Sequence, residues 1–306
     1  MKKFLVFLMV GLLSFISIGC GGADEEAAVE SDNTQKIVVA SKPFTENYIM
    51  AEMITLLLQN RTDLEVEYLP IEGGTTSVLH PALVNGDIDI YPEYTGTGWQ
   101  EVLKNDSTDQ TPEELFELVR NDYQENFDIV WLPSFGFDDT FTLAVTSALA
   151  TSKGLTTFSD LAKVSQELRF GSEPDFYERK DGYDGLVAAY GFQFKEARQM
   201  AIALKYKAIE SNEVDVINAF STDGMLKRFE MVVLKDDLNY FPSYLCAPIV
   251  RGETLRAHPE IGEVLAELAG VIDEATMTQL NYQVDELKQE PRAVAEEFLV
   301  SLELLR

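Results

Sequence analysis

Short apolar runs that are typical of buried strands alternate with helical patterns along most of this 306-residue chain. The first run covers residues 37–40, and residues 47–60 follow it with apolar side chains at helical spacing. Residues 64–69 and 87–91 read as two further strands, with a helix predicted between them after the glycine pair at 73–74. Strands that alternate with helices predict an α/β fold with a largely parallel sheet.

The second half of the chain repeats this order without a convincing sequence repeat. We predict strands at residues 141–145, 168–171, 213–217, 231–234 and 247–250, and helices beginning at residue 158 and over residues 183–201, 259–285 and 290–304. Two α/β halves of similar pattern indicate two lobes with a cleft between them. In such sheets, ligands bind beyond the carboxyl ends of the strands.

The N-terminus predicts export. Lys2 and Lys3 precede an apolar stretch that is too short and wrongly flanked for an ordinary membrane span, and small residues then lead to Cys20. This segment resembles a bacterial lipoprotein signal, although Ser17 stands where leucine is more usual. We expect residues 1–19 to be the signal peptide and Cys20 to be lipidated. The alternative is a plain secretion signal. Residues 20–35 are small, acidic and polar, so they predict a flexible tether.

Charge and composition exclude several classes of function. The formal net charge is −28, so nucleic acid is not an expected partner, because phosphate binding needs a basic surface. The acidity fits solubility, or attraction of cationic ligands. Cys20 and Cys246 have different contexts and are not expected to pair. His80 and His258 lack ligand-spaced neighbours, so we expect no metal site, no cofactor and no histidine-based catalytic triad.

Eight stretches, in order along residues 36–300, resemble the osmoprotectant-binding proteins of ABC importers, of the glycine betaine, choline and carnitine type. They are residues 41–46, 73–75, 86–97, 136–141, 175–179, 181–183, 221–224 and 241–244. The resemblance implies a two-lobed periplasmic-binding-protein fold, type II-like, with two crossings between the lobes and a ligand cleft. Lobe one would hold residues 36–138 and 246–306, and lobe two residues 139–245.

The resemblance also implies a ligand site for a quaternary-ammonium solute. In the family, aromatic rings from both lobes surround the trimethylammonium group, donors hold the carboxylate of a betaine, and one backbone carbonyl faces the cation. The matching positions are Tyr94, Phe141, Phe220 and Tyr244 for the rings, Lys42, Thr97 and Arg179 for the donors, and Asp139 for the carbonyl.

Physical chemistry explains why rings suit this ligand. A quaternary ammonium has no N–H to donate, whereas the negative face of an aromatic ring attracts it. Family members often have tyrosine where this chain has Phe141 and Phe220, so two hydroxyls are missing here. Each of these residues, taken singly, has an ordinary structural interpretation. The rings could be core residues, Lys42 could be a solvated lysine, and Arg179 could be part of a surface charge cluster.

The predicted function is solute capture without chemistry. Ligand would close the lobes, and the closed form would deliver it to a membrane permease driven by a cytoplasmic ATPase. We expect an exported monomer, held by its lipid on the outer face of the cell membrane or in the periplasm. The alternatives are a receptor for another polar or zwitterionic solute, a sensory ligand-binding subunit, or an exported enzyme on the same fold.

Overall fold

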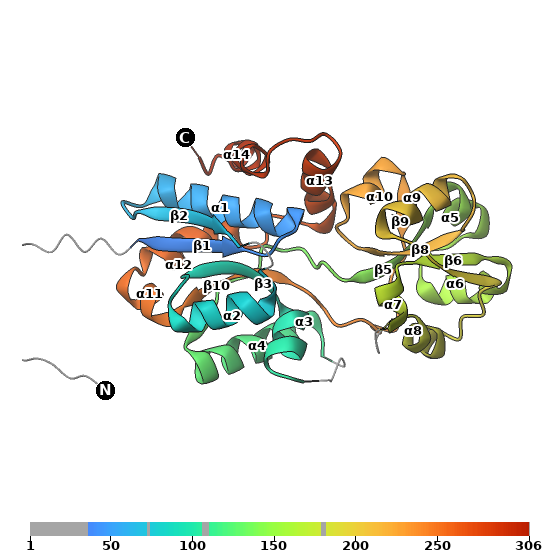
Figure 1. Cartoon of the computed structure of the whole chain (residues 1–306), viewed down its shortest axis with the longest axis horizontal. Coiled ribbons are helices and arrows are strands. Elements are labelled where there is room, and N and C mark those ends of the chain that lie inside the picture. Colours follow the sequence, from blue (N-terminus) through green and yellow to red (C-terminus); the bar gives the residue numbers. More distant parts are fainter. Residues whose placement is uncertain (1–35, 72–73, 106–109, 179–181, 306) are drawn as a thin grey trace, which may run out of the picture. The chain divides into compact units, whose positions relative to one another are not determined.

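Two five-stranded sheets, each flanked by helices, organise the chain (Figure 1). The computed structural model describes residues 36–71, 74–105, 110–178 and 182–305, which belong to one compact unit, Gln35–Arg306. Within these residues, none of the helices combines the length and the apolar character that crossing a membrane requires. The predicted signal peptide, Cys20 and the predicted tether lie outside the described residues.

The first sheet has the strand order β2-β1-β3-β10-β4. Its strands are β1 (Ile37–Ser41), β2 (Val66–Pro70), β3 (Ile90–Tyr94), β4 (Ile129–Trp131) and β10 (Cys246–Arg251). Its helical elements are α1 (Thr45–Arg61), α2 (Thr76–Asn85), α3 (Thr95–Thr97), η1 (Gly98–Val102), α4 (Pro112–Phe127), α11 (Gly252–Ala257), α12 (Glu260–Leu265), η3 (Ala266–Leu268), α13 (Glu274–Asp285) and α14 (Pro291–Ser301).

Each face of this sheet carries its own apolar core, because side chains alternate along a strand. Ile37 and Val39 of β1 are fully buried in the core that they share with α1, α12, α13 and α14. Ala40 belongs to the core on the other face, with Tyr123 of α4 and Trp131 of β4. The sheet is therefore buried on both sides, which explains why β1 is apolar almost throughout.

The second sheet has the order β7-β6-β8-β5-β9. Its strands are β5 (Phe141–Thr146), β6 (Arg169–Ser172), β7 (Glu196–Gln199), β8 (Val216–Phe220) and β9 (Met231–Val233). Its helical elements are α5 (Ser147–Lys153), α6 (Phe158–Val164), η2 (Ser165–Glu167), α7 (Pro174–Glu178), α8 (Tyr183–Tyr190), α9 (Ile202–Glu210) and α10 (Gly224–Arg228). Leu143 and Val145 of β5 pack into one core and Ala144 into another, so this sheet too is buried on both faces.

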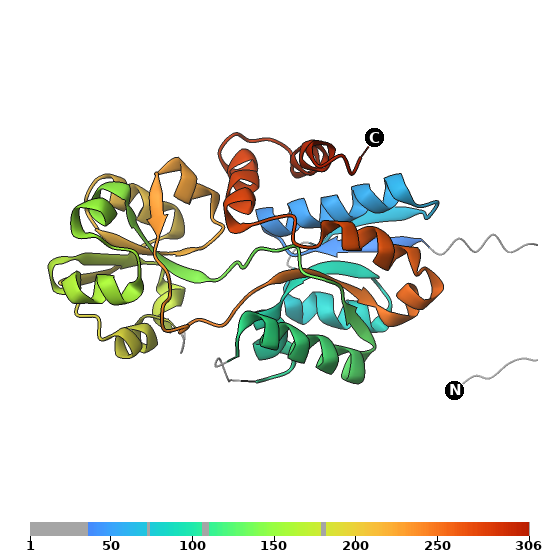
Figure 2. The same cartoon turned by 180° about the vertical axis from the view of Figure 1, so that it is seen from behind.

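The chain passes between the two sheets twice, after β4 and before β10 (Figure 2). The two passing segments meet at Asp138, which forms an isolated antiparallel bridge with Leu245. The Asp138 carboxylate accepts hydrogen bonds from the backbone N–H of Tyr244 (2.7 Å) and the hydroxyl of Ser243 (2.6 Å). Burial raises the pKa of this carboxyl to about 6. The predicted lobe boundaries at 138/139 and 245/246 fall beside this bridge and remain a prediction.

The expectation of a largely parallel sheet holds for four of the five strands in each sheet, and one strand runs against them. β1 pairs in parallel with β2 and β3, but β10 runs antiparallel to both β3 and β4. Likewise, β6 pairs in parallel with β7 and β8, but β5 runs antiparallel to β8 and β9. The reason is that β5 and β10 enter their sheets directly from a passing segment. No crossover helix then forces them to run parallel to their neighbours.

Several predicted elements differ in extent from those in the structure. The predicted helix over 183–201 ends at Tyr190, because Gly191 takes a left-handed conformation (φ 70°), and β7 follows. The predicted helix over 259–285 is two helices, broken before Asp273, which caps α13. β3 and β8 each begin three residues later than predicted. The α4 helix was not predicted, although Thr111 and Glu114 form a capping box at its start.

Helix α10 of the second sheet packs against α13, which lies beside the first sheet. Gly224 allows this close approach, since a Cβ there would lie 2.6 Å from the backbone nitrogen of Tyr282. The amide of Asn281 donates to the carbonyl oxygen of Thr222 (2.9 Å), and Arg228 forms an ion pair with Glu286. The contact between α10 and α13 therefore involves backbone atoms of α13, which cannot move aside as a flexible side chain can.

The substitution Gly224→Ala should destabilise the protein by about 1–3 kcal/mol, because the added methyl group has no space against the α13 backbone. Gly262→Ala is the matched control, since its nearest neighbour would be a flexible Leu255 methyl group at 3.3 Å. It should be neutral, or stabilising by up to about 1 kcal/mol. Urea unfolding of both variants checks this, and a neutral Gly224→Ala would contradict the tight contact.

Candidate functional site

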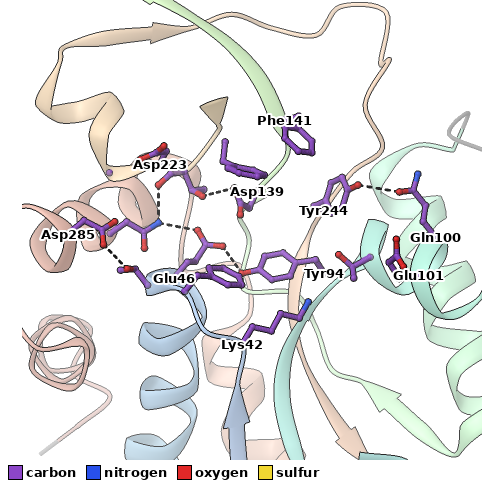
Figure 3. A pocket seen from close by; sticks show the side chains of 17 residues that line it. Lys42, Glu46, Tyr94, Gln100, Glu101, Asp139, Phe141, Asp223, Tyr244 and Asp285 are labelled. Atoms are coloured by element: carbon purple, nitrogen blue, oxygen red, sulfur yellow. Dashed lines mark hydrogen bonds between the residues drawn. The ribbon is translucent and has the colours of Figure 1, made fainter. Parts of the chain in front are cut away.

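A pocket of about 550 Å³ brings together side chains from both sheets (Figure 3). Seven of the eight predicted ligand residues line it: Lys42, Tyr94, Thr97, Asp139, Phe141, Phe220 and Tyr244. The eighth, Arg179, lies outside the described residues. The lining residues that were not predicted are Phe44, Thr45, Glu46, Gln100, Glu101, Thr222, Asp223, Gly224, Asn281 and Asp285.

Three of the aromatic side chains that line the pocket belong to the first or last residue of a strand. Tyr94 is the last residue of β3 and Phe220 the last of β8, while Phe141 is the first of β5. Phe141 pairs with Phe220 across the two strands, which places their ring centroids 4.7 Å apart. Phe44, a ring that was not predicted, lies 6.0 Å from Tyr94. Phe220 is 41% exposed, so its face is available to a ligand.

Tyr244 reaches the pocket from the segment just before β10. Its ring packs directly on Gly96, where a Cβ would lie only 2.7 Å from the ring carbon Cε1. Its hydroxyl lies 3.3 Å from the side-chain oxygen Oε1 of Gln100. Glycine at position 96 is thus what lets the Tyr244 ring lie against α3 beside the half-buried Thr97.

Lys42 is fixed at the base of the pocket by a buried ion pair. Its ammonium group bonds to the carboxylate of Glu93, and it lies 5.1 Å from the centroid of the Tyr94 ring. Glu93 is fully buried, and it also accepts hydrogen bonds from Thr76 (2.9 Å) and Tyr91 (3.2 Å). Lys42 is only 8% exposed, so it is a built part of the site and not a solvated lysine.

One end of the pocket is acidic. Glu46, in the first turn of α1, is 3% exposed and accepts hydrogen bonds from the Tyr94 hydroxyl (2.7 Å) and the Asn281 amide (3.1 Å). Asp139 accepts one from the Thr222 hydroxyl (2.8 Å). Burial raises the pKa of Glu46. It also raises the pKa of Asp139 well above its usual range, and the neighbouring Glu46 charge adds to that shift.

The sequence did not reveal this acidic end. Glu46 is the last residue of the motif stretch 41–46, but an acid in the first turn of a helix is common and says nothing about burial. Asn281 comes from a helix far along the chain and carried no local signal. The pocket therefore offers ring faces, one fixed ammonium group and buried carboxylates, a set that can bind a molecule with both a cation and a carboxylate. Among the residues that the structure describes, no cluster of His, Cys, Asp or Glu could hold a metal ion.

Replacing Glu93 by Gln should destabilise the protein by about 3–5 kcal/mol, because the Lys42 charge would then be buried without a counter-charge. Glu67→Gln is the control, since Glu67 pairs with Lys36 on the exposed surface and its loss should change stability little. Chemical denaturation measures both. Equal small effects would mean that the Lys42 charge is well solvated in the folded protein.

Comparison with known proteins identifies a family whose members resemble this chain over most of its length. The family described as the substrate binding domain of ABC-type glycine betaine transport systems matches residues 35–301. A relative from Helicobacter pylori, the ergothioneine transport permease/ergothioneine binding protein EgtU, is 41% identical over 88% of this chain, which spans 48% of that protein's length. The carnitine transport binding protein OpuCC of Listeria monocytogenes is 34% identical over 97% of this chain and 96% of its own length.

A solved structure of a protein with a related description also matches this chain. The structure described as a glycine betaine/carnitine/choline ABC transporter is 33% identical, covers 88% of this chain and 99% of its own, and superposes with a TM-score of 0.84. The predicted two-lobed α/β binding-protein fold is thereby confirmed. The chain belongs to the family of substrate-binding domains of ABC-type glycine betaine transport systems.

Proposed function

We propose that this chain captures a trimethylammonium zwitterion, a betaine in the broad sense, for an ABC importer. The convergence of Tyr94, Phe141, Phe220 and Tyr244 in one pocket is the observation that supports this ligand class. A quaternary ammonium offers no N–H, so carboxylates alone cannot single it out. Each ring face contributes roughly 0.5–2 kcal/mol to binding such a cation once water is excluded.

The ligand's carboxylate belongs at the Lys42 side of the pocket. The ammonium group of Lys42 has further N–H groups besides those that face Glu93, and Thr97 adds a hydroxyl. Arg179, outside the described residues, is proposed as the third donor on the basis of the motif alone. The relatives are named for ergothioneine and carnitine, and both compounds carry a trimethylammonium group together with a carboxylate.

Capture would proceed by closure of the two lobes, with residues 36–138 and 246–306 as lobe one and residues 139–245 as lobe two. Tyr94 comes from the first sheet, whereas Phe141 and Phe220 come from the second. A ligand that contacts both sets gains its full binding energy only when the sheets approach. Binding therefore shifts the population towards the closed form.

We further propose that Cys20 is lipidated after removal of residues 1–19, and that residues 20–35 tether the binding unit to the membrane. This would keep a monomeric receptor close to the permease, which a cytoplasmic ATPase drives. The chain would carry out no chemistry on its ligand. Mass spectrometry of the expressed protein would test lipidation at Cys20, and an unmodified Cys20 would contradict it.

A calorimetric panel tests the ligand class: glycine betaine, carnitine, ergothioneine, choline and glycine. Trimethylammonium zwitterions should bind, choline should bind more weakly because it lacks the carboxylate, and glycine should not bind. Binding of glycine with no binding of any trimethylammonium compound would favour a receptor for another solute. Turnover of a bound compound would favour the enzyme alternative.

Within that panel, Tyr244→Ala should weaken binding of every trimethylammonium ligand by about 1–2 kcal/mol, because one ring face is lost. Tyr244→Phe is the matched control. It keeps the ring and removes only the hydroxyl next to Gln100, so its affinity should stay close to that of the wild type. If both substitutions cost the same, the hydroxyl and not the ring face would be what the ligand needs.

Affinity for such a ligand should fall on acidification. The pKa values of Glu46 and Asp139 are raised, and the other charged groups that contact them or line the same pocket are Lys42, Glu101, Asp138, Asp223 and Asp285. A bound cation stabilises the charged carboxylates and so lowers their pKa, which means that binding releases protons. Titrations from about pH 8 down to about pH 5, in buffers of different ionisation enthalpy, should show weaker binding and measurable proton release. A flat profile would contradict it.

A further inference from the structure

The acidic end of the pocket has more hydrogen-bond acceptors than donors. The Glu46 carboxylate receives hydrogen bonds from Tyr94 and Asn281, and the side chains of Thr222 and Asp139 also contact it, so it shares the Thr222 hydroxyl with Asp139. Each carboxylate can accept about four hydrogen bonds. The nearby Asp285 already receives the Thr45 hydroxyl, at 2.6 Å. Buried acceptors that lack donors are costly, so this end of the pocket is suited to a ligand that supplies N–H groups.

Asn281 points to the same conclusion independently. Its side chain lines the pocket and is only 5% exposed. The amide nitrogen is fully used, since it donates to Glu46 and to the carbonyl oxygen of Thr222. The amide oxygen Oδ1 is buried and has no hydrogen-bond partner. An unpaired buried carbonyl beside a buried carboxylate requires a donor from elsewhere.

This end of the pocket begins where the aromatic part stops. Tyr94 contributes its ring to the aromatic part, and its hydroxyl donates directly to Glu46. A ligand whose trimethylammonium group contacts the Tyr94 ring therefore needs only one further substituent to reach Glu46. Glycine betaine has no such substituent and no N–H, so it would leave these acceptors unpaired.

We propose that Glu46, Asp139 and Asn281 form a second subsite that accepts hydrogen bonds from an N–H-bearing ring on the ligand. This rests on the proposed function, because it assumes that the aromatic part holds a trimethylammonium group. The preferred ligand is then a trimethylammonium amino acid with a nitrogen heterocycle as its side chain. Ergothioneine, whose ring carries two N–H groups, is the probe of this class.

The test compares ergothioneine with glycine betaine on wild type and on Glu46→Gln. Wild type should bind ergothioneine at least about tenfold more tightly than glycine betaine. Glu46→Gln should weaken binding of both ligands, because it removes a counter-charge for the trimethylammonium group, but the loss should be at least about tenfold larger for ergothioneine. Glu52→Gln is the matched control, a buried glutamate on the same helix that pairs with Arg292 and does not line the pocket. It should leave both affinities unchanged.

The outcomes separate the two proposals. If wild type binds neither compound, the proposed function fails. The second subsite is overturned, and the proposed function stands, if the wild-type protein binds glycine betaine as tightly as ergothioneine. The same holds if Glu46→Gln weakens binding of the two ligands equally, because Glu46 then acts only as a counter-charge or as a support for Tyr94. If Glu46→Gln does not fold, the affinity of the wild-type protein is measured for ergothioneine methylated on both ring nitrogens. An affinity equal to that for ergothioneine overturns the subsite, and a loss of at least about tenfold supports it.

Discussion

The buried carboxylate of Glu93 is the interaction on which the geometry of the site depends. It receives the Lys42 ammonium, the Thr76 and Tyr91 hydroxyls, and the backbone N–H of Tyr94. One carboxylate thus joins the end of β1, the start of α2 and the end of β3. A fully buried charge is stable only when it is paired and fully hydrogen-bonded, so these groups are held in place together. The positions of Lys42 and Tyr94 in the pocket follow from this network.

The mixed direction of the strands explains how residues far apart in the chain meet at one site. β5 and β10 each run antiparallel to both neighbouring strands, and each enters its sheet next to a residue that lines the pocket, Phe141 or Tyr244. Phe141 is therefore the first residue after one passing segment, and Tyr244 lies just before the strand that follows the other. In the register of β10 and β3, Cys246 lies opposite Tyr94, which brings the end of that segment next to the aromatic part of the pocket.

Much of the fold and of the aromatic part of the site could be predicted, because strands, helices and motif positions are local features. Lys42, Tyr94 and Phe141 stand within the motif stretches, and the structure brings them into one pocket. The reversed direction of β5 and β10 could not be predicted, because it depends on which sheet the chain has just left. Glu46 and Asn281 were missed because burial and pairing arise from contacts between residues 235 positions apart.

The bridge between Asp138 and Leu245 joins the two passing segments within a few residues of Asp139, Phe141 and Tyr244. Under the closure proposed here, the stretches that bend are the same stretches that contact the ligand. Recognition and movement then share one set of side chains. Selection for a new ligand at these positions would also reset how often the empty receptor closes, so its substrate range and its resting equilibrium would evolve together.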